Sequence, residues 1–234
     1  MDTFCTVTTL REPFEQTLKF TLYHLKAGAS QVILFFDDPD DPAADALAEV
    51  ERVAIVRCGE THWRESGLPP QPSIEDRQEY NANLGLDFAR RQGYDWIVHI
   101  DSDELLHVEN DSIRQALTAV DGHCPAVQFQ VLEAVPSRLE HASPFDEVHT
   151  FRVQRHWRYE KWAKRLGCRG AFHDGQYFRG HVVGKSATRV RSDVRELHLH
   201  EPIMRDGTSP NRMPLDKGFV LHYDCCGLNA FRRK

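Results

Sequence analysis

Residues 96–106 read WIVHIDSDELL, and this stretch decides the fold. It opens with a short apolar run of the length that is typical of a buried β-strand. Three carboxylates, Asp101, Asp103 and Glu104, follow directly. Carboxylates packed this closely repel one another unless a cation lies among them, and hard oxygen ligands favour Mg²⁺ or Mn²⁺. The alternative interpretation is an acidic turn that leads to a helix beginning near Asp111.

The chain before this stretch alternates apolar runs with helical patterns. The runs cover residues 3–9, 31–36 and 53–56. The helical patterns cover residues 12–27, 43–52 and 74–92, and the first and last of these end at Gly28 and Gly93. Strands separated by helices of this length indicate βαβ units and a mainly parallel, doubly wound sheet. Ligands bind at the carboxyl ends of the strands in such sheets.

Two further patterns complete the predicted fold. In the first helix, Phe14, Leu18, Leu22 and Leu25 recur at helical spacing and are predicted to form its buried face. After residue 121, apolar stretches at 126–131, 149–153, 182–190 and 195–200 follow one another without long helices, which indicates antiparallel strands and loops. The sequence thus predicts one α/β domain over residues 1–234, with a nucleotide-binding half at 1–121 and an acceptor-binding, metal-completing half at 122–234. The ending FRRK resembles the start of a helix, so we expect the natural chain to continue past Lys234.

Charge is divided unevenly along the chain. Its 234 residues are 41% hydrophobic and 27% charged, enough for a substantial core, with a formal net charge of -6. Residues 1–151 carry 11 Lys and Arg against 27 Asp and Glu, whereas residues 152–195 carry 12 against 3. This division disfavours a uniformly basic nucleic-acid binder, so no stable nucleic-acid partner is expected. It favours one basic segment that handles an anion.

No signal peptide and no membrane-spanning run can be recognised in the sequence. The six cysteines contain no C-x-x-C pair and are expected to be reduced thiols. The expected location is therefore the cytoplasm, with peripheral membrane contact left open.

A second acidic strand end lies at Asp37 and Asp38, directly after the run at 31–36. A carboxylate at this edge of a doubly wound sheet can accept hydrogen bonds from a base or a ribose. The alternative is a loop of turn-forming residues that includes Pro39 and Pro42.

Four stretches together resemble one known family. They are FTLYHLKAGASQVILFFDD at 20–38, RQEYNANLGLDFARRQGYDWIVHIDSDELL at 77–106, VGKSATRVRSDVRELHLHEP at 183–202 and LHYDCCGLNAFRRK at 221–234. In order and spacing they are similar to the GT-A glycosyltransferases of the family-2-like and family-92-like group, in which a D-x-D-E motif closes the fourth strand. The resemblance covers most of the chain and implies a GT-A-like fold, a nucleotide-sugar donor that is expected to be UDP-linked, and Mn²⁺ or Mg²⁺.

The resemblance also implies roles for individual residues. Asp103 would bind the metal and act in catalysis with Asp101, which would contact the ribose or the metal. A late histidine would complete the metal site, and the candidates are His198, His200 and His222. The expected donor-binding residues are Asp37, Asp38, Gln78, Asn81, Asp101, Lys185 and Arg189.

Glycosyl transfer requires groups that stabilise the departing diphosphate and a base for the acceptor. Lys185, Arg189 and Arg191 lie in the basic segment and are candidates for the first role. An inverting enzyme needs a carboxylate base near the acceptor hydroxyl. The candidates by position are Glu133, Asp146, Glu147 and Asp174. Of these, Glu147 is the residue that we expect to act in catalysis.

The leading hypothesis is a metal-dependent hexosyl- or related transferase that acts on a glycan or lipid-linked glycan acceptor. One alternative is a nucleotidyltransferase on a similar sheet, although the chain lacks a Gly-rich phosphate loop of the usual kind. The other is a non-catalytic RNA- or carbohydrate-binding module built on RVQRHWRYEKWAKR at 152–165, where basic and aromatic residues alternate.

Overall fold

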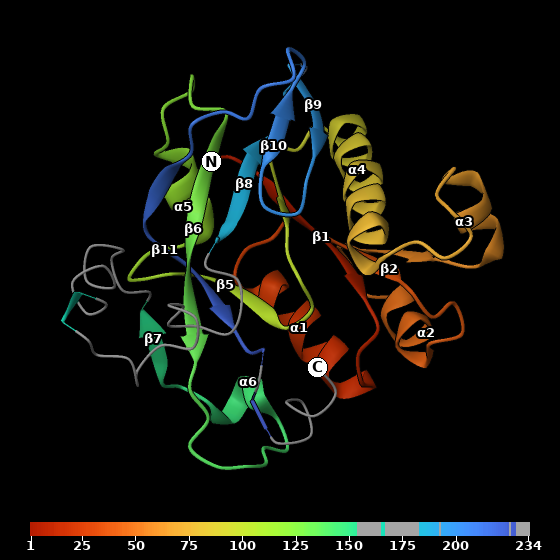
Figure 1. The fold of residues 1–234 in the computed structure, drawn as a ribbon, viewed down its shortest axis with the longest axis vertical. Coiled ribbons are helices and arrows are strands. Elements are labelled where there is room, and N and C mark those ends of the chain that lie inside the picture. Colours follow the sequence, from red (N-terminus) through yellow and green to blue (C-terminus); the bar gives the residue numbers. More distant parts are fainter. Residues whose placement is uncertain (154–164, 167–182, 192, 225, 228–234) are drawn as a thin grey trace.

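The computed structural model of the chain describes residues 1–153, 165–166, 183–191, 193–224 and 226–227. Within these residues a large mixed sheet carries helices on both faces (Figure 1). The strands are β1 Phe4–Leu10, β2 Gln31–Phe36, β3 Val53–Arg57, β4 Trp96–His99, β5 Glu104–Val108, β6 Ala126–Ala134, β7 Phe151–Val153, β8 Lys185–Arg189, β9 Val194–Leu197, β10 Pro202–Met204 and β11 Met213–His222. The helices are α1 Phe14–Lys26, α2 Pro42–Ala48, α3 Glu60–Glu65, α4 Ile74–Gln92, α5 Ile113–Thr118 and α6 Pro144–Glu147.

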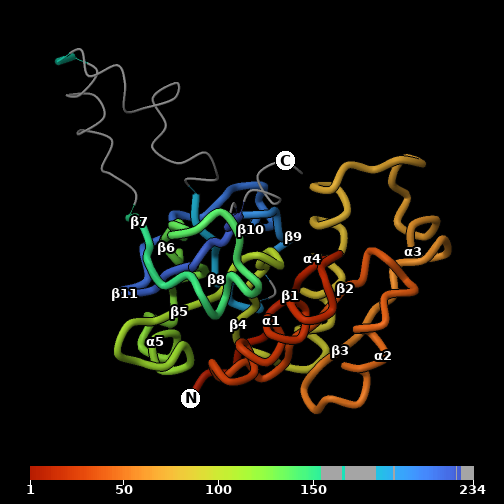
Figure 2. Tube along the Cα trace, turned by 90° about the horizontal axis from the view of Figure 1, so that it is seen from below, coloured from red at the N-terminus to blue at the C-terminus, as the bar shows by residue number. Residues whose placement is uncertain are grey.

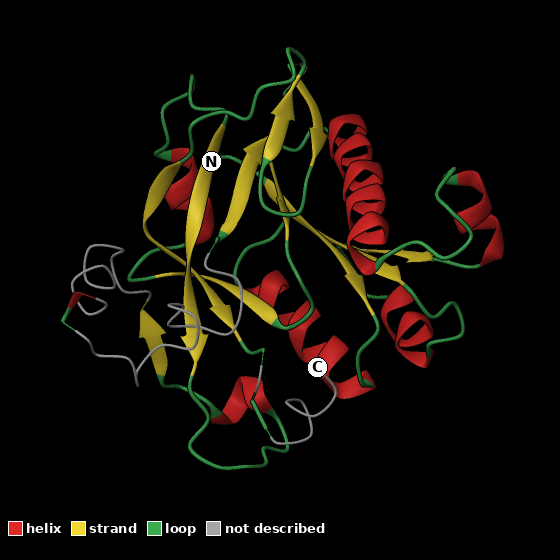
Figure 3. Cartoon of the chain, viewed as in Figure 1, coloured by secondary structure: helices red, strands yellow, loops and turns green. Residues whose placement is uncertain are grey.

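The sheet has a parallel half and a mixed half. Its strand order is β3-β2-β1-β4-β8-β6-β11-β5, with β7 paired to β6. The first four strands run parallel, as the sequence predicts. Strand β8 is antiparallel to both β4 and β6, and β11 runs parallel to β6 but antiparallel to β5. The predicted α/β fold is thus confirmed, but the second half of the sheet is mixed rather than antiparallel throughout, because β11 pairs parallel with β6 (Figure 3).

Alternate residues of the central strands supply two separate cores. In β1, Phe4 belongs to the core under α1, α2 and α5, whereas Cys5 and Val7 belong to the core under α4 and the β9–β10 hairpin. This alternation follows from the two-residue period of a strand. Figures 1 and 2 place α2 and α3 near the β3 edge of the molecule and α5 near the β5 edge.

Helix α4 is fixed at both ends and packs closely on the sheet. Ser73 and Asp76 form a reciprocal capping box at its start, and Gly93 ends it with a φ of 72°. At Gly85 a Cβ atom would lie only 2.6 Å from Val7 Cγ2, so a larger residue would push the helix off β1. The first turns of α4 lie at the carboxyl ends of β1, β2 and β4.

The structure corrects the expectation for the segment after Asp103. The helix near Asp111 exists as α5, but β5 lies between it and β4. Strand β5 pairs with β11 at the far edge of the sheet, and its apolar side chains enter the core. The run at 104–108 is too short for sequence periodicity to identify it as a strand. Its partner strand, β11, lies more than a hundred residues further along the chain, so neighbouring residues do not reveal the pairing either.

The predicted buried face of α1 is also wrong in part. Phe14 and Leu22 are exposed, whereas Thr17, Thr21 and His24 are buried. Thr21 and His24 tolerate burial because their side chains are hydrogen-bonded, whereas the Thr17 hydroxyl is buried without a hydrogen-bond partner among the described residues. Thr21 donates to the Thr17 carbonyl at 2.8 Å, for example.

No helix in the described part of the chain is long and apolar enough to cross a membrane. The thiols of Cys5, Cys58 and Cys124 are free, as the sequence predicts. Most of the basic and aromatic segment, residues 154–164, lies outside the described residues, as does Asp174.

We predict that His24 makes the fold sensitive to acid. Its Nδ1 donates to the Phe20 carbonyl at 2.9 Å and its Nε2 accepts from the Leu106 N–H at 3.3 Å, so the neutral ring joins α1 to β5. Burial lowers the pKa of His24 to about 4. The folded state therefore binds fewer protons than the unfolded state between pH 6.5 and 4, and stability is lost as the pH falls through this window.

His24→Gln removes this titration. Between pH 7 and pH 4 the free energy of unfolding should fall by about 3 kcal/mol more in the wild type than in the variant. Urea unfolding followed by circular dichroism at a series of pH values measures this difference. An identical pH dependence for both proteins would contradict the role assigned to His24.

Candidate functional site

Helix α4 sends three polar side chains to the carboxyl edge of the sheet. Arg77 holds both oxygens of Asp37, at 2.8 and 2.7 Å. Gln78 donates to Asp101 Oδ1 at 3.0 Å, one turn from Asn81, which donates to Thr9 Oγ1 at 2.9 Å. The structure thus brings together four of the predicted donor-binding residues, Asp37, Gln78, Asn81 and Asp101. Asp38 follows Asp37 and accepts the Asp40 N–H in a local turn.

A buried lysine lies between two carboxylates of the stretch at 101–104. Lys185 Nζ is 2.7 Å from Asp101 Oδ2 and 3.5 Å from Glu104 Oε2, and the lysine side chain is 1% exposed. Glu104 also accepts the backbone N–H of Asp101 at 3.0 Å. The three charges and the turn between β4 and β5 therefore form one compact cluster.

The pKa values of this cluster reflect burial opposed by opposite charge. Burial alone would raise the pKa of Asp101, but Lys185 holds it well below its ordinary range. Burial raises the pKa of Glu104 to about 7 despite the attraction of the same ammonium. Burial would lower the pKa of Lys185, but Glu104 and Asp101 raise it above its ordinary value.

For two of these carboxylates the neighbouring cation is the Lys185 ammonium, and not the divalent metal that the sequence predicts. Lys185 was assigned to the donor phosphates, and the structure instead uses it to neutralise Asp101 and Glu104. Asp103 is turned elsewhere. Its backbone carbonyl accepts the Tyr223 N–H at 2.9 Å, which places its side chain beside the end of β11.

Asp103 meets two residues from the end of β11 in the one potential metal-binding group found in the described part of the chain. Donor atoms of Asp103, His222 and Asp224 all lie within 4.8 Å of one another. His222 Nε2 is 3.8 Å from Asp103 Oδ2, and its Nδ1 contacts Glu133 Oε2 at 2.9 Å. A carboxylate that receives the second ring N–H of a metal-binding histidine fixes the ring orientation and tautomer.

This donor set fits a divalent metal such as Mn²⁺. Two carboxylates supply hard oxygen ligands, and one imidazole nitrogen is compatible with a first-row transition ion. Burial would lower the pKa of His222, but Glu133 and Asp103 raise it to about 9. The apo group therefore carries a proton on this ring near neutral pH, and a metal ion must displace it.

Asp224 is a site residue that the sequence analysis missed. His222 and Asp224 are only two residues apart, at the end of β11 and in the turn that follows it. That spacing was visible in the LHYD segment, and it would have indicated Asp224 once His222 was considered a ligand.

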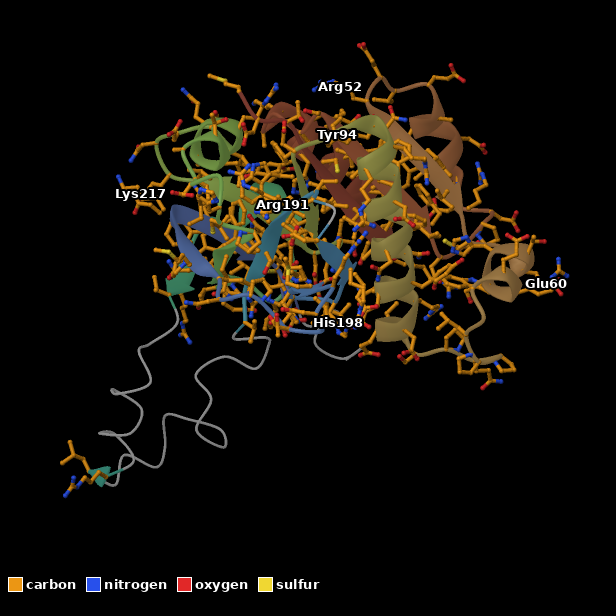
Figure 4. All side chains as sticks on the ribbon, turned by 90° about the horizontal axis from the view of Figure 1, so that it is seen from above. Arg52, Glu60, Tyr94, Arg191, His198 and Lys217 are labelled. Atoms are coloured by element: carbon orange, nitrogen blue, oxygen red, sulfur yellow. The ribbon has the colours of Figure 1, made fainter. Side chains whose placement is uncertain are left out.

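The structure does not bring the other predicted metal ligands into this group. Asp101 is engaged by Lys185 and Gln78. His200 lies close enough to Asp101 to lower the pKa of that carboxylate. His198 is 45% exposed and faces Glu79 of α4 and Glu196 (Figure 4).

Arg189 and Arg191 also lie away from this group. The Arg189 guanidinium covers the Trp96 ring at 4.1 Å and donates to the carbonyls of Val120 and Cys124. Arg189 is at the opposite end of β8 from Lys185, so it braces the amino end of β4. Arg191 forms an ion pair with Asp193 at 2.9 Å.

The candidate bases also have other partners. Glu147 accepts hydrogen bonds from Arg138, His141 and the backbone of Ala142 and Ser143, and these bonds, led by His141, lower its pKa and weaken it as a base. Asp146 pairs with Lys19 at 2.6 Å. Glu133 orients His222. Glu147 therefore stabilises a loop, and the structure does not support its assignment to catalysis.

A pocket of about 380 Å³ adjoins the metal-binding group. Asp103, Tyr223 and Asp224 form one wall, and the residues that link β1 to α1 form another. The loop around His141 and α6 closes a third side. The pocket thus lies at the carboxyl ends of parallel strands, where sheets of this kind bind ligands.

Comparisons with known proteins give distant relatives. No protein-family model matches the chain. Two Arabidopsis thaliana proteins named glycosyltransferase-like are 27% and 25% identical, each over 94% of this chain, and the aligned region makes up 53% and 46% of their lengths. The chain therefore spans about half the length of the curated relatives that it matches.

Solved structures show only a weak likeness. Core-mannan synthase A from Aspergillus fumigatus, in a Mn/GDP form, has a TM-score of 0.39 at 11% identity. The alignment covers 81% of this chain and 60% of the synthase chain. The 4-diphosphocytidyl-2C-methyl-D-erythritol synthase from Anaerococcus prevotii has a TM-score of 0.35 at 13% identity and covers 74% and 79%. Scores this low do not transfer a ligand position from either protein.

We predict that Lys185 is essential for stability. Lys185→Met leaves two buried carboxylates without their counter-ion, which should lower the free energy of unfolding by about 3–5 kcal/mol. Adding Glu104→Gln to this variant should recover part of the loss, because one uncompensated acid is removed. Urea unfolding with the exposed Lys217→Met as control measures the effect. A loss no larger in Lys185→Met than in the control would contradict the assigned role.

We also predict that Asp103, His222 and Asp224 bind Mn²⁺. Asp103→Asn and Asp224→Asn should each weaken Mn²⁺ at least tenfold in isothermal titration calorimetry, and Glu133→Gln should weaken it roughly 10- to 100-fold. The exposed Asp111→Asn is the control. Affinity should rise with pH up to about 9, because Mn²⁺ competes with the proton on His222. Unchanged Mn²⁺ affinity in Asp224→Asn would contradict the site.

Proposed function

We propose that the chain is a metal-dependent glycosyltransferase that uses a nucleotide-sugar donor. The observation that carries this proposal is the group formed by Asp103, His222 and Asp224, which opens on a pocket at the carboxyl ends of β4 and β11. The names of the Arabidopsis relatives support the same class of reaction.

The transfer step consists of one bond formed and one bond broken. The acceptor hydroxyl oxygen bonds to the anomeric carbon, and the bond from that carbon to the diphosphate breaks. The electron pair leaves with the diphosphate, and the hydroxyl proton passes to a base. A metal bound at Asp103 would supply electrostatic stabilisation of the negative charge on the diphosphate.

The donor nucleoside would bind along the row of polar side chains on α4. Asp37 is held by Arg77 and Asp101 by Gln78, so both carboxylates have fixed orientations before a ligand arrives. Preformed acceptors of this kind suit the hydroxyls of a ribose and the N–H groups of a base. We expect a UDP-linked donor and a glycan or lipid-linked glycan acceptor.

Ligand-dependent thermal stability tests this proposal. UDP, GDP, CMP and their sugars are added with and without Mn²⁺, and the melting temperature is followed. A ligand at a hundredfold its Kd stabilises the folded state by about 2.7 kcal/mol. One nucleoside diphosphate should stabilise the wild type only with Mn²⁺, and Asp103→Asn should abolish this dependence.

Other outcomes identify other functions. If no nucleotide stabilises the protein, the transferase proposal is contradicted and a binding module is favoured. Binding of RNA at low salt, or of a glycan, would then identify that module. Consumption of a nucleoside triphosphate with release of pyrophosphate would instead show a nucleotidyltransferase.

A further inference from the structure

The pocket beside the metal-binding group is strongly acidic apart from one side chain. Its carboxylates are Glu12, Asp103, Glu140 and Asp224. Arg11 is the one arginine or lysine from the described part of the chain that lines it. A negatively charged diphosphate must enter this pocket if the proposed function holds, so the position of this cation matters.

The basic residues first expected to bind phosphate are engaged elsewhere. Lys185 is buried between Asp101 and Glu104, Arg189 covers Trp96, and Arg191 pairs with Asp193. Arg11, by contrast, is exposed, and no ion pair with a carboxylate is found for it within the described residues. An anionic ligand can therefore bind it without displacing a carboxylate of the described residues.

The backbone on both sides of Arg11 is held in place. The Leu10 carbonyl accepts the Asp37 N–H at 3.0 Å, which ties the end of β1 to the end of β2. Glu12 accepts the Ser102 hydroxyl at 2.9 Å, which ties it to the turn that carries Asp103. The base of the Arg11 side chain is thus fixed relative to the metal-binding group.

We propose that Arg11 binds the diphosphate of the nucleotide-sugar donor opposite Asp103 and Asp224. This inference rests on the proposed function for the identity of the ligand. The planar guanidinium donates two parallel hydrogen bonds to phosphate oxygens, and its positive charge offsets the charge that grows on the departing group. Helix α1 begins three residues later, at Phe14. Its N-cap Pro13 and Gln16 of its first turn line the same pocket, and the amino end of the helix adds a positive electrostatic potential there.

Inorganic pyrophosphate tests the proposal independently of base and sugar. Its Kd is measured by calorimetry in saturating Mn²⁺ for the wild type, Arg11→Gln and Arg11→Lys. Arg64→Gln is the matched control, because Arg64 is exposed on α3 and does not line the pocket. Arg11→Gln should weaken pyrophosphate and UDP about tenfold or more, Arg11→Lys should weaken them less, and uridine should be unaffected.

Mn²⁺ affinity without pyrophosphate separates this role from a structural one. It should be the same in Arg11→Gln and the wild type, because Arg11 is not a metal ligand. Equal pyrophosphate affinity in these two proteins, or no pyrophosphate binding by the wild type, would overturn the proposal. A third outcome is that Arg11→Gln loses pyrophosphate binding while the wild type transfers no sugar. This outcome would support the diphosphate site and contradict the glycosyltransferase assignment.

Discussion

The buried contact between Lys185 and the carboxylates of Asp101 and Glu104 is the interaction on which the site depends. Lys185 comes from β8, in the second half of the chain, and the carboxylates come from the turn between β4 and β5. The Lys185 ammonium thus forms ion pairs between the two halves of the sheet, at the carboxyl end of β4. Lys185 neutralises Asp101 and Glu104, whereas Asp103 faces His222 and Asp224.

The second half of the chain therefore completes a site that the first half begins. Strand β6 supplies Glu133, which orients His222 at the end of β11. The parallel strands supply Asp37 and Asp101, which α4 holds from the other side. Nucleoside, diphosphate and metal are assigned to adjacent parts of one edge, and each part is fixed by hydrogen bonds within the protein.

The sequence predicted the features that local periodicity controls. Strands β1 to β4, helix α4 and the proximity of Asp37 and Asp101 follow from apolar runs and from the rule that parallel strands end at one edge. Gln78 and Asn81 were expected at this site from the family resemblance alone. The role of Lys185 could not be predicted, because it depends on β8 pairing antiparallel with β4. The buried face of α1 was misassigned because Thr21 and His24 are hydrogen-bonded inside the protein, which hydrophobicity alone does not reveal, and because Thr17 is buried although its hydroxyl has no hydrogen-bond partner among the described residues.

Anomalous diffraction at the manganese edge, from crystals grown with Mn²⁺ and UDP, would locate the metal. We expect one manganese peak beside the carboxylate oxygens of Asp103 and Asp224 and His222 Nε2, with Lys185 still paired to Asp101. A peak on Asp101 with Lys185 displaced, or no ordered manganese in this pocket, would contradict this expectation.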